Sequence, residues 1–248
     1  MERIALQRGA SEARQLVNEI LATEPAQAVA YRADLQKSES LANWLRPHLL
    51  KLIAQIGIPD NKVRILEDKQ PWVYLHPIDG KDPAQDDGEF HLSFCKTSYD
   101  VAEWEQVNVS KDDASFGYGD PVHVEWETPP EGQRGSAYLR HEFTVDRSFE
   151  EVWLQMQCDD GAIIYVDGKE AGRYNILPEE AERYRMPVKG GIYDNGETTT
   201  RTIKLQDGIA PGRHVLAISL HNHTTTSSDL RLADVRLYGA PLEAEEER

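Results

Sequence analysis

The sequence predicts a mainly β protein, in which a β-sandwich over residues 89–240 follows a small α-helical region. Two observations predict this class. Apolar and polar residues alternate with a period of two in several segments beyond residue 88, and short clusters of turn-forming residues separate those segments. Many short strands joined by polar turns are typical of a sandwich or barrel.

Four segments carry the strand pattern most clearly. The first two alternate strictly. Leu139, His141, Phe143 and Val145 share one face of the first strand, and Val152, Leu154, Met156 and Cys158 share one face of the second strand. A strand over 162–166 runs into Asp167-Gly168, which suits the positive φ angles of a tight hairpin turn, so residues 169–174 are the predicted return strand. Two further strands are predicted over 215–220 and 230–238.

Residues 1–57 are expected to be helical instead. Leu16, Val17, Ile20 and Leu21 form an apolar stripe after a candidate cap at Ser11, and similar stripes continue from Pro25 to Gly57. Such short helices cannot bury their apolar stripes alone. They pack on one another, on the β domain or on a second copy of the chain, so a homo-oligomer formed through them is one open expectation.

Residues 58–88 are predicted to form a hairpin and a linker. Val63 and Ile65 alternate before a run at 72–75, with a turn expected over 67–70. Residues 79–88 are rich in Asp and Gly without an apolar period, which places the main domain boundary there. Residues 241–248 are predicted to form an acidic, solvated tail.

The composition narrows the classes of partner. The chain has 248 residues, a formal net charge of −16 and 28% charged residues, so it lacks the basic patches that nucleic acids require. It also lacks an apolar run long enough for membrane insertion. A cytoplasmic location is expected if the chain is complete, and an extracellular one if it is a fragment of a secreted protein. Cys95 and Cys158 allow at most one disulfide.

An ordered set of motifs resembles a known family. Ser115-Phe116-Gly117-Tyr118-Gly119-Asp120 comes first, then Tyr138-Leu139-Arg140, then the stretch from Asp159-Asp160-Gly161 to Asp167-Gly168. Arg173-Tyr174-Asn175 and Thr226-Ser227-Ser228-Asp229-Leu230 follow. These segments resemble galactose-binding-like domains over about 150 residues, excluding the helical front.

The resemblance implies a jelly-roll β-sandwich, a fold that is commonly appended to bacterial extracellular hydrolases and surface proteins. It implies binding rather than catalysis, although the same sandwich serves for sugar binding, protein contacts and scaffolding. The aspartate-rich hairpin also resembles the PA14-like sugar-binding fold, in which adjacent aspartates hold calcium. A PA14-like sandwich is therefore the alternative fold.

Five residues are candidates for ligand binding. Trp153 projects from the face opposite Leu154, beside Gln155 and Gln157, and an aromatic ring flanked by amides suits stacking on a sugar. The alternative is that a helix or the hairpin covers this face. Tyr118 and Asn222 lie in predicted loops and complete the set. Trp104 and Trp126 are further aromatic candidates, although such residues are more often part of a core.

Asp159 and Asp160 are the candidate metal ligands, with Asp120 and the aspartates of 111–113 as additions if their loops fold toward the same end. Calcium prefers several oxygen ligands in loose geometry, which carboxylates between two strands can supply. The alternative is a tight turn whose aspartates accept backbone N–H bonds.

The remaining hypothesis is a metal-dependent hydrolase. His221 and His223 are spaced to share a zinc ion with His214 or Asp229. The sequence contains neither Gly-x-Ser-x-Gly nor His-Glu-x-x-His. We therefore expect a non-catalytic recognition module for a saccharide, with a structural or protein-interaction domain as the second hypothesis and an enzyme as the third.

Overall fold

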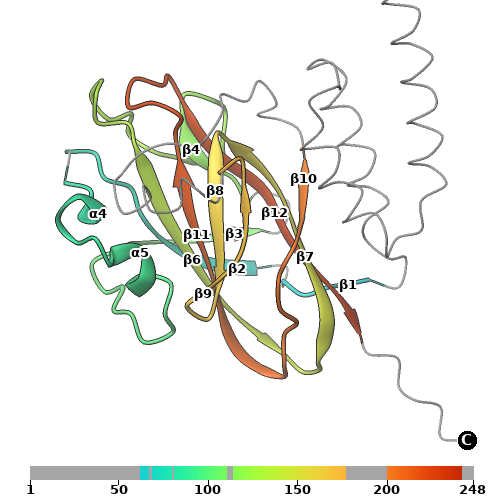
Figure 1. Cartoon of the computed structure of the whole chain (residues 1–248). Coiled ribbons are helices and arrows are strands. Elements are labelled where there is room, and N and C mark those ends of the chain that lie inside the picture. Colours follow the sequence, from blue (N-terminus) through green and yellow to red (C-terminus); the bar gives the residue numbers. More distant parts are fainter. Residues whose placement is uncertain (1–61, 67–68, 80, 111–113, 177–199, 242–248) are drawn as a thin grey trace, which may run out of the picture. The chain divides into compact units, whose positions relative to one another are not determined.

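The computed structural model describes residues 62–66, 69–79, 81–110, 114–176 and 200–241. They form a mainly β sandwich of two sheets, which confirms the predicted fold class (Figure 1). All of them except Lys62 belong to one compact unit, residues 63–248. The helices predicted within 1–57, the aspartates at 112 and 113 and the tail beyond Pro241 lie outside the described residues.

The first sheet has the strand order β10-β7-β12-β4-β5, and β1 pairs with β12 beside this path. Its longest pairing joins β7 to β12, where a bulge between Ala233 and Arg236 shifts the register. The strands of this sheet are β1 (Val63–Arg64), β4 (Phe116–Tyr118), β5 (Val124–Glu125), β7 (Phe149–Asp159), β10 (Arg201–Lys204) and β12 (Leu230–Pro241).

The second sheet has the order β3-β2-β6-β11-β8-β9. The pairing of β6 with β11 runs unbroken from Gly212 opposite Val145 to His221 opposite Ser136. The predicted turn is present, because Asp167 and Gly168 have φ angles of 51° and 84° between β8 and β9. The strands are β2 (Lys69–Leu75), β3 (Glu105–Ser110), β6 (Ser136–Val145), β8 (Gly161–Val166), β9 (Lys169–Tyr174) and β11 (Gly212–His221).

The main hydrophobic core lies between the two sheets. It takes alternate residues of each strand, such as Leu139 of β6 and Leu154 of β7, both with no exposed surface. Trp72 of β2 meets Phe116 of β4 across the sandwich, with 5.5 Å between ring centroids. The period of two that predicted these strands is therefore the pattern of their burial.

A second apolar cluster covers the outer face of the second sheet. It is built by α4 (Pro83–Asp86) and α5 (Phe90–Ser93), which lie beside β6 and β11 in Figure 1. Phe90 and Phe94 pack on Tyr138, with ring centroids 4.8 and 5.2 Å from its ring. Arg140 fastens the segment by donating to the carbonyls of Phe94 and Lys96.

Two predictions for residues 58–88 were wrong. Val63 and Trp72 do not share a hairpin, because β1 pairs with β12 in the first sheet and β2 pairs with β3 and β6 in the second. The stretch 79–88 does not separate domains either. Ala84 belongs to the same outer cluster as Phe90 and Tyr138, and Asp82 caps α4.

The two cysteines are both buried, and no disulfide joins them. Cys95 belongs to the outer cluster and Cys158 to the core between the sheets, so the single disulfide that the sequence allows is not formed. Burial raises the pKa of the Cys95 thiol to about 11.

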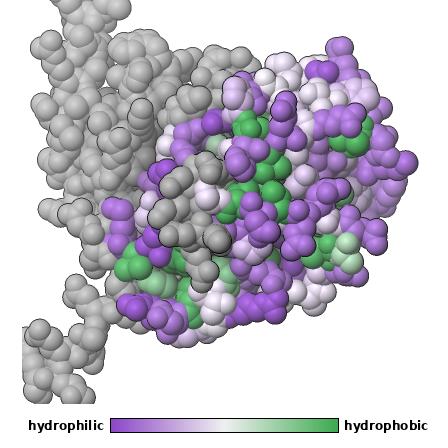
Figure 2. Space-filling view, turned by 180° about the vertical axis from the view of Figure 1, so that it is seen from behind, coloured by the Kyte–Doolittle hydropathy of each residue, from purple (hydrophilic) through white to green (hydrophobic). Residues whose placement is uncertain are grey.

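The described surface is mostly polar. Figure 2 shows hydrophilic residues over much of the face seen from behind, with apolar residues in separate smaller areas. Among described residues, the exposed large apolar side chains are Val63, Ile78 and Leu92. The helices of the described part are too short to cross a bilayer.

Gly117 offers a test of how closely β4 and β12 approach. A Cβ atom at this position would overlap the carbonyl oxygen of Leu230 on the paired strand. We expect Gly117→Ala to lower the free energy of unfolding by about 2 kcal/mol or more, because backbone must shift to make room. Gly88→Ala is the matched control, since a Cβ there meets nothing within 4 Å. Urea unfolding that gives equal values for both variants would contradict the described pairing.

Candidate functional site

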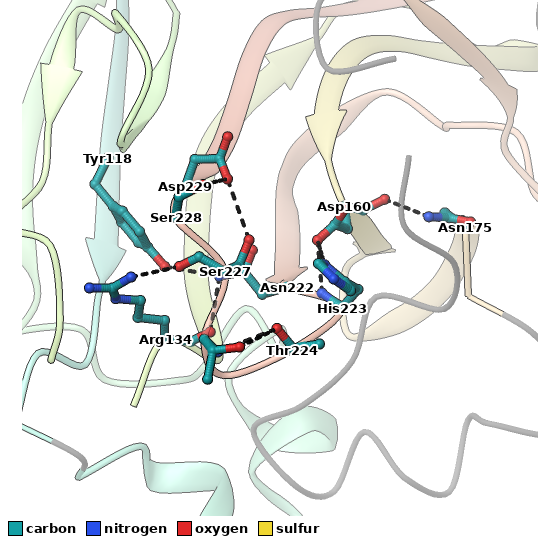
Figure 3. A network of polar contacts seen from close by, with 11 residues as sticks. Tyr118, Arg134, Asp160, Asn175, Asn222, His223, Thr224, Ser227, Ser228 and Asp229 are labelled. Atoms are coloured by element: carbon teal, nitrogen blue, oxygen red, sulfur yellow. Dashed lines mark hydrogen bonds and ion pairs between the residues drawn. The ribbon is translucent and has the colours of Figure 1, made fainter. Parts of the chain in front are cut away.

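Polar side chains gather at one end of the sandwich (Figure 3). They come from five segments that are distant in sequence: the end of β4, the residues before β6, the β7–β8 turn, the end of β9 and the β11–β12 loop. We call this region the loop end. It contains Arg134, Asp160, Asn175 and the run from Asn222 to Asp229.

Tyr118 and Asn222 are joined at the loop end, although 104 residues separate them. The Nδ2 atom of Asn222 donates to the Tyr118 hydroxyl and to the Arg134 carbonyl, both at 2.9 Å. Because a carbonyl can only accept, these contacts fix the orientation of the amide. The Oδ1 atom of Asn222 is buried and has no hydrogen-bond partner. Burial raises the pKa of Tyr118 to about 12, although the bond from Asn222 opposes the rise.

Arg134 holds two loops of this end together. Its Nε donates to the carbonyl of Pro129 at 2.8 Å and its Nη1 to the carbonyl of Ser227 at 3.0 Å. The carbonyl of Thr225 accepts from the backbone of both Gly132 and Arg134. The segment before β6 and the β11–β12 loop are therefore joined mainly through backbone acceptors and one guanidinium, whose rigid fork suits such contacts.

Asp160 organises the other side of the loop end. Its Oδ2 accepts from the backbone N–H of His223 at 2.8 Å and lies 2.7 Å from Nδ1 of the same residue. Its carbonyl accepts from Nδ2 of Asn175 at 2.9 Å. Asp160 is only 1% exposed, whereas His223 and Asn175 are half-buried and reach the surface.

The other predicted ligand residues lie on the outer face of the first sheet. Gln155 donates to Thr202, and Gln157 bridges Arg231 and Asp234. Trp153 is 2% exposed and belongs to neither hydrophobic cluster. The structure thus divides the predicted set into two groups, and Trp153 presents no open ring face. Its stacking role stays a prediction.

The metal predictions receive no further support from the described contacts. Asp120 is half-buried, and no described contact joins it to Asp159 or Asp160. Within the described part of the chain, no three His, Cys, Asp or Glu side chains are grouped to hold a metal ion. The histidines of the predicted zinc site are also apart: His214 contacts Asp167 at one end of β11, whereas His221 ends the strand and His223 contacts Asp160.

A chain of buried polar groups runs beneath α4 and α5, beside the loop end. Asp82 Oδ1 accepts from the Tyr138 hydroxyl and from the Ala84 N–H, both at 2.9 Å. The ring of His221 lies between two serine hydroxyls, with Ser136 at Nδ1 and Ser219 at Nε2. Burial raises the pKa of Asp82 and lowers that of His221 to about 3, with His91 adding to the latter.

Sequence reasoning missed several residues of this region. Arg134 stands alone among Pro, Gly and Gln, with no periodic pattern to mark it. His76 follows β2 and stacks on Trp126 with centroids 4.7 Å apart, and burial lowers its pKa to about 4. The sequence contains only a weak indication of the role of His76, because this residue simply continues the alternation of Trp72 and Tyr74.

The lowered pKa values of His76 and His221 predict that the folded chain loses stability in mild acid. Their folded pKa values lie below the ordinary 6.5, so the unfolded chain binds protons first as the pH falls. The stability that is present above pH 6.5 is therefore lost as the pH falls toward 4, by up to about 1.4 kcal/mol per pH unit for each ring. The raised pKa of Asp82 opposes this trend at the acidic end.

Urea unfolding between pH 7 and pH 4.5 measures this effect. We expect His76→Phe to reduce the slope of stability against pH, whereas replacing the exposed His123 with Asn leaves it unchanged. An identical slope for the wild type and His76→Phe would refute the neutral state of the half-buried His76.

Comparisons with known proteins give only weak similarities. No protein-family model matches the chain, and no curated protein matches it. Among solved structures, a beta-glucuronidase from an uncultured Clostridium species matches at 15% identity with a TM-score of 0.39, over 75% of this chain and 30% of that chain.

Structures of a β-glucuronidase from Ruminococcus gnavus also match. The complex with uronic isofagomine has 11% identity and a TM-score of 0.36, over 66% of this chain and 22% of that chain. The complex with D-glucuronic acid has 11% identity and a TM-score of 0.36, over 66% and 23%. Each of these matches spans less than a third of the other protein.

Proposed function

We propose that the sandwich is a non-catalytic recognition module that binds a saccharide at the loop end. The observation that carries the proposal is the Asn222 side chain, which is completely buried and leaves Oδ1 without a partner next to the Tyr118 hydroxyl. A buried acceptor without a partner costs about 1–3 kcal/mol, so a bound donor recovers that free energy.

The surroundings of Asn222 match the chemistry of a sugar. Thr224, Ser227 and Asn175 are half-buried and carry hydroxyl or amide groups that both donate and accept. Each sugar hydroxyl also donates and accepts, and small polar groups held on rigid loops fix its orientation. Arg134 supplies that rigidity, because it ties the flanking loop to the carbonyl of Ser227.

A recognition role fits these residues better than catalysis. Ser136 and Ser219 contact the ring of His221, and burial lowers the pKa of His221 to about 3, which makes this imidazole a weak base for activating either hydroxyl. The Oδ2 atom of Asp160 takes two contacts from His223, so this carboxylate oxygen serves to hold the β11–β12 loop in place.

Saccharide binding can be measured with a glycan array followed by calorimetric titration of the sugars that bind. We expect Thr224→Ala to weaken binding by about two- to tenfold, which corresponds to one hydrogen bond. Thr144→Ala is the matched control, because Thr144 is exposed on β6 near its other end. A wild-type chain that binds no saccharide would exclude this function and favour a structural or protein-interaction domain.

We also propose calcium as a brace for the loop end, through Asp159 and Asp160. Calcium requires six to eight oxygen ligands. Because His223 already contacts the Asp160 carboxylate, binding would require this histidine to turn away. If calcium binds the folded chain, a concentration about 100 times its Kd adds ~2.7 kcal/mol of stability.

The measurement is the melting temperature with calcium and with a chelator. A rise in the wild type that is absent in Asp159→Asn is the expected result. Asp207→Asn serves as the control, since Asp207 is an exposed aspartate in another loop. Equal melting temperatures in calcium and in chelator would rule out a calcium site.

A further inference from the structure

The strands at the ends of the two sheets differ in length. An end strand presents backbone N–H and C=O groups that no neighbouring strand pairs, and proteins limit further pairing there with short strands, bulges, charges or a covering segment. In the first sheet the end strands are β5 and β10, with two and four residues. In the second sheet they are β3 and β9, with six residues each. The long edges are therefore those of the second sheet.

The β9 edge is protected against further pairing. A bulge interrupts its pairing with β8, and bulges twist an edge strand locally. Glu170 and Arg173 form an ion pair on the strand, which places charged side chains there. The carbonyl of Ala171 accepts from the N–H of Gln206 at 2.8 Å, so part of the backbone that faces away from β8 is already paired.

The β3 edge carries none of these protections. Its sequence, Glu-Gln-Val-Asn-Val-Ser, contains no proline, lysine or arginine, and its one charged residue is the first. Its pairing with β2 runs from Glu105 to Ser110 without a bulge. Gln106 and Asn108 are exposed, and among the described residues none outside β2 makes a backbone hydrogen bond to either. β3 is therefore an open edge.

Pro71 of β2 shows which groups of β3 point outward. It lies opposite Asn108 and has no N–H to donate. In an antiparallel ladder, pairs that exchange two hydrogen bonds alternate with pairs that exchange none. The pair of Pro71 and Asn108 is therefore of the second kind, and Val107 and Val109 make the bonds to β2. The backbone N–H and C=O groups of Asn108, and of Gln106 two residues before it, consequently point to the open edge.

A second copy of β3 complements this edge. In an antiparallel pairing centred on Asn108, the two Asn108 residues face each other across a two-fold axis and exchange two backbone hydrogen bonds. Gln106 then faces Ser110 of the other copy, so polar residues meet. Val107 faces Val109, so apolar residues meet. The single charged residue of each strand lies at opposite ends of the ribbon, about 20 Å from its counterpart, which exceeds the Debye length at physiological salt.

We infer that β3 is a dimerisation edge, at which two copies of the chain pair their β3 strands antiparallel about Asn108 and join their second sheets into one. The interface contains none of the loop-end residues, so it does not depend on saccharide binding. It also differs from the oligomer that the sequence predicts through residues 1–57. A pairing of two edges buries less surface than a standard interface of about 1,600 Å², so the association is weak and depends on concentration.

Sedimentation velocity of the full chain over a range of concentrations measures this association. We expect the mass to rise from 28.1 kDa toward twice that value. Asn108→Pro removes the central outward N–H and should raise the dissociation constant about tenfold or more. The melting temperature of the dilute variant should stay close to that of the wild type, because this N–H makes no bond to β2. Asn108→Ala is the matched control, since it keeps the N–H and should dimerise like the wild type.

Cysteine cross-linking tests the register. In Asn108→Cys the two new cysteines lie opposite each other with about 5.5 Å between Cα atoms, a distance that a disulfide spans. Gln106→Cys is the matched control, because the two copies of residue 106 lie about 14 Å apart, which is too far for a bridge. The native Cys95 and Cys158 are buried.

Disulfide-linked dimers on a non-reducing gel from Asn108→Cys but not from Gln106→Cys would support the inference. Three results would each overturn it: a wild type that stays monomeric at every concentration, an Asn108→Pro variant that dimerises like the wild type, or equal cross-linking of the two cysteine variants.

Discussion

The pairing of β6 with β11 is the constraint on which the rest of the structure depends. Its register places Leu139 opposite Ile218 on the inner face and Tyr138 opposite Ser219 on the outer face. Because side chains alternate between faces, a slip of one residue would exchange the core with the outer cluster. The same register sends His221 outward to the serines and leaves Asn222 to turn inward toward Tyr118.

Two neighbouring residues therefore serve two different polar systems. His221 has both ring nitrogens in contact with hydroxyls and is completely buried, so its surroundings are satisfied without a ligand. Asn222 is equally buried, yet half of its amide is not satisfied. This difference between two adjacent residues distinguishes a buried polar group with a structural role from one that belongs to a candidate site.

Much of the β-sandwich could be predicted from the sequence, because alternation marks each long strand and Asp167-Gly168 marks the hairpin. Pairing partners could not be predicted for β1 and β2, since alternation within a strand does not show which sheet the strand joins. The sequence around Asp82 predicts a linker because the apolar residues that pack on the outer cluster, Ala84 and Phe90, are few and are separated by turn residues. Among the site residues, Tyr118 and Asn222 were named, but their contact and the unpaired Oδ1 depend on three-dimensional packing.

Arg134 has a consequence for how such a site changes over evolution. Its guanidinium donates to the backbone carbonyls of Pro129 and Ser227 rather than to their side chains. Backbone carbonyls are present whatever residue occupies a position, so the surrounding loop residues are free to be exchanged while the frame keeps its shape. A single guanidinium therefore fixes the shape of the loop end independently of the side chains around it, and substitutions of those side chains change its surface chemistry without refolding the loops.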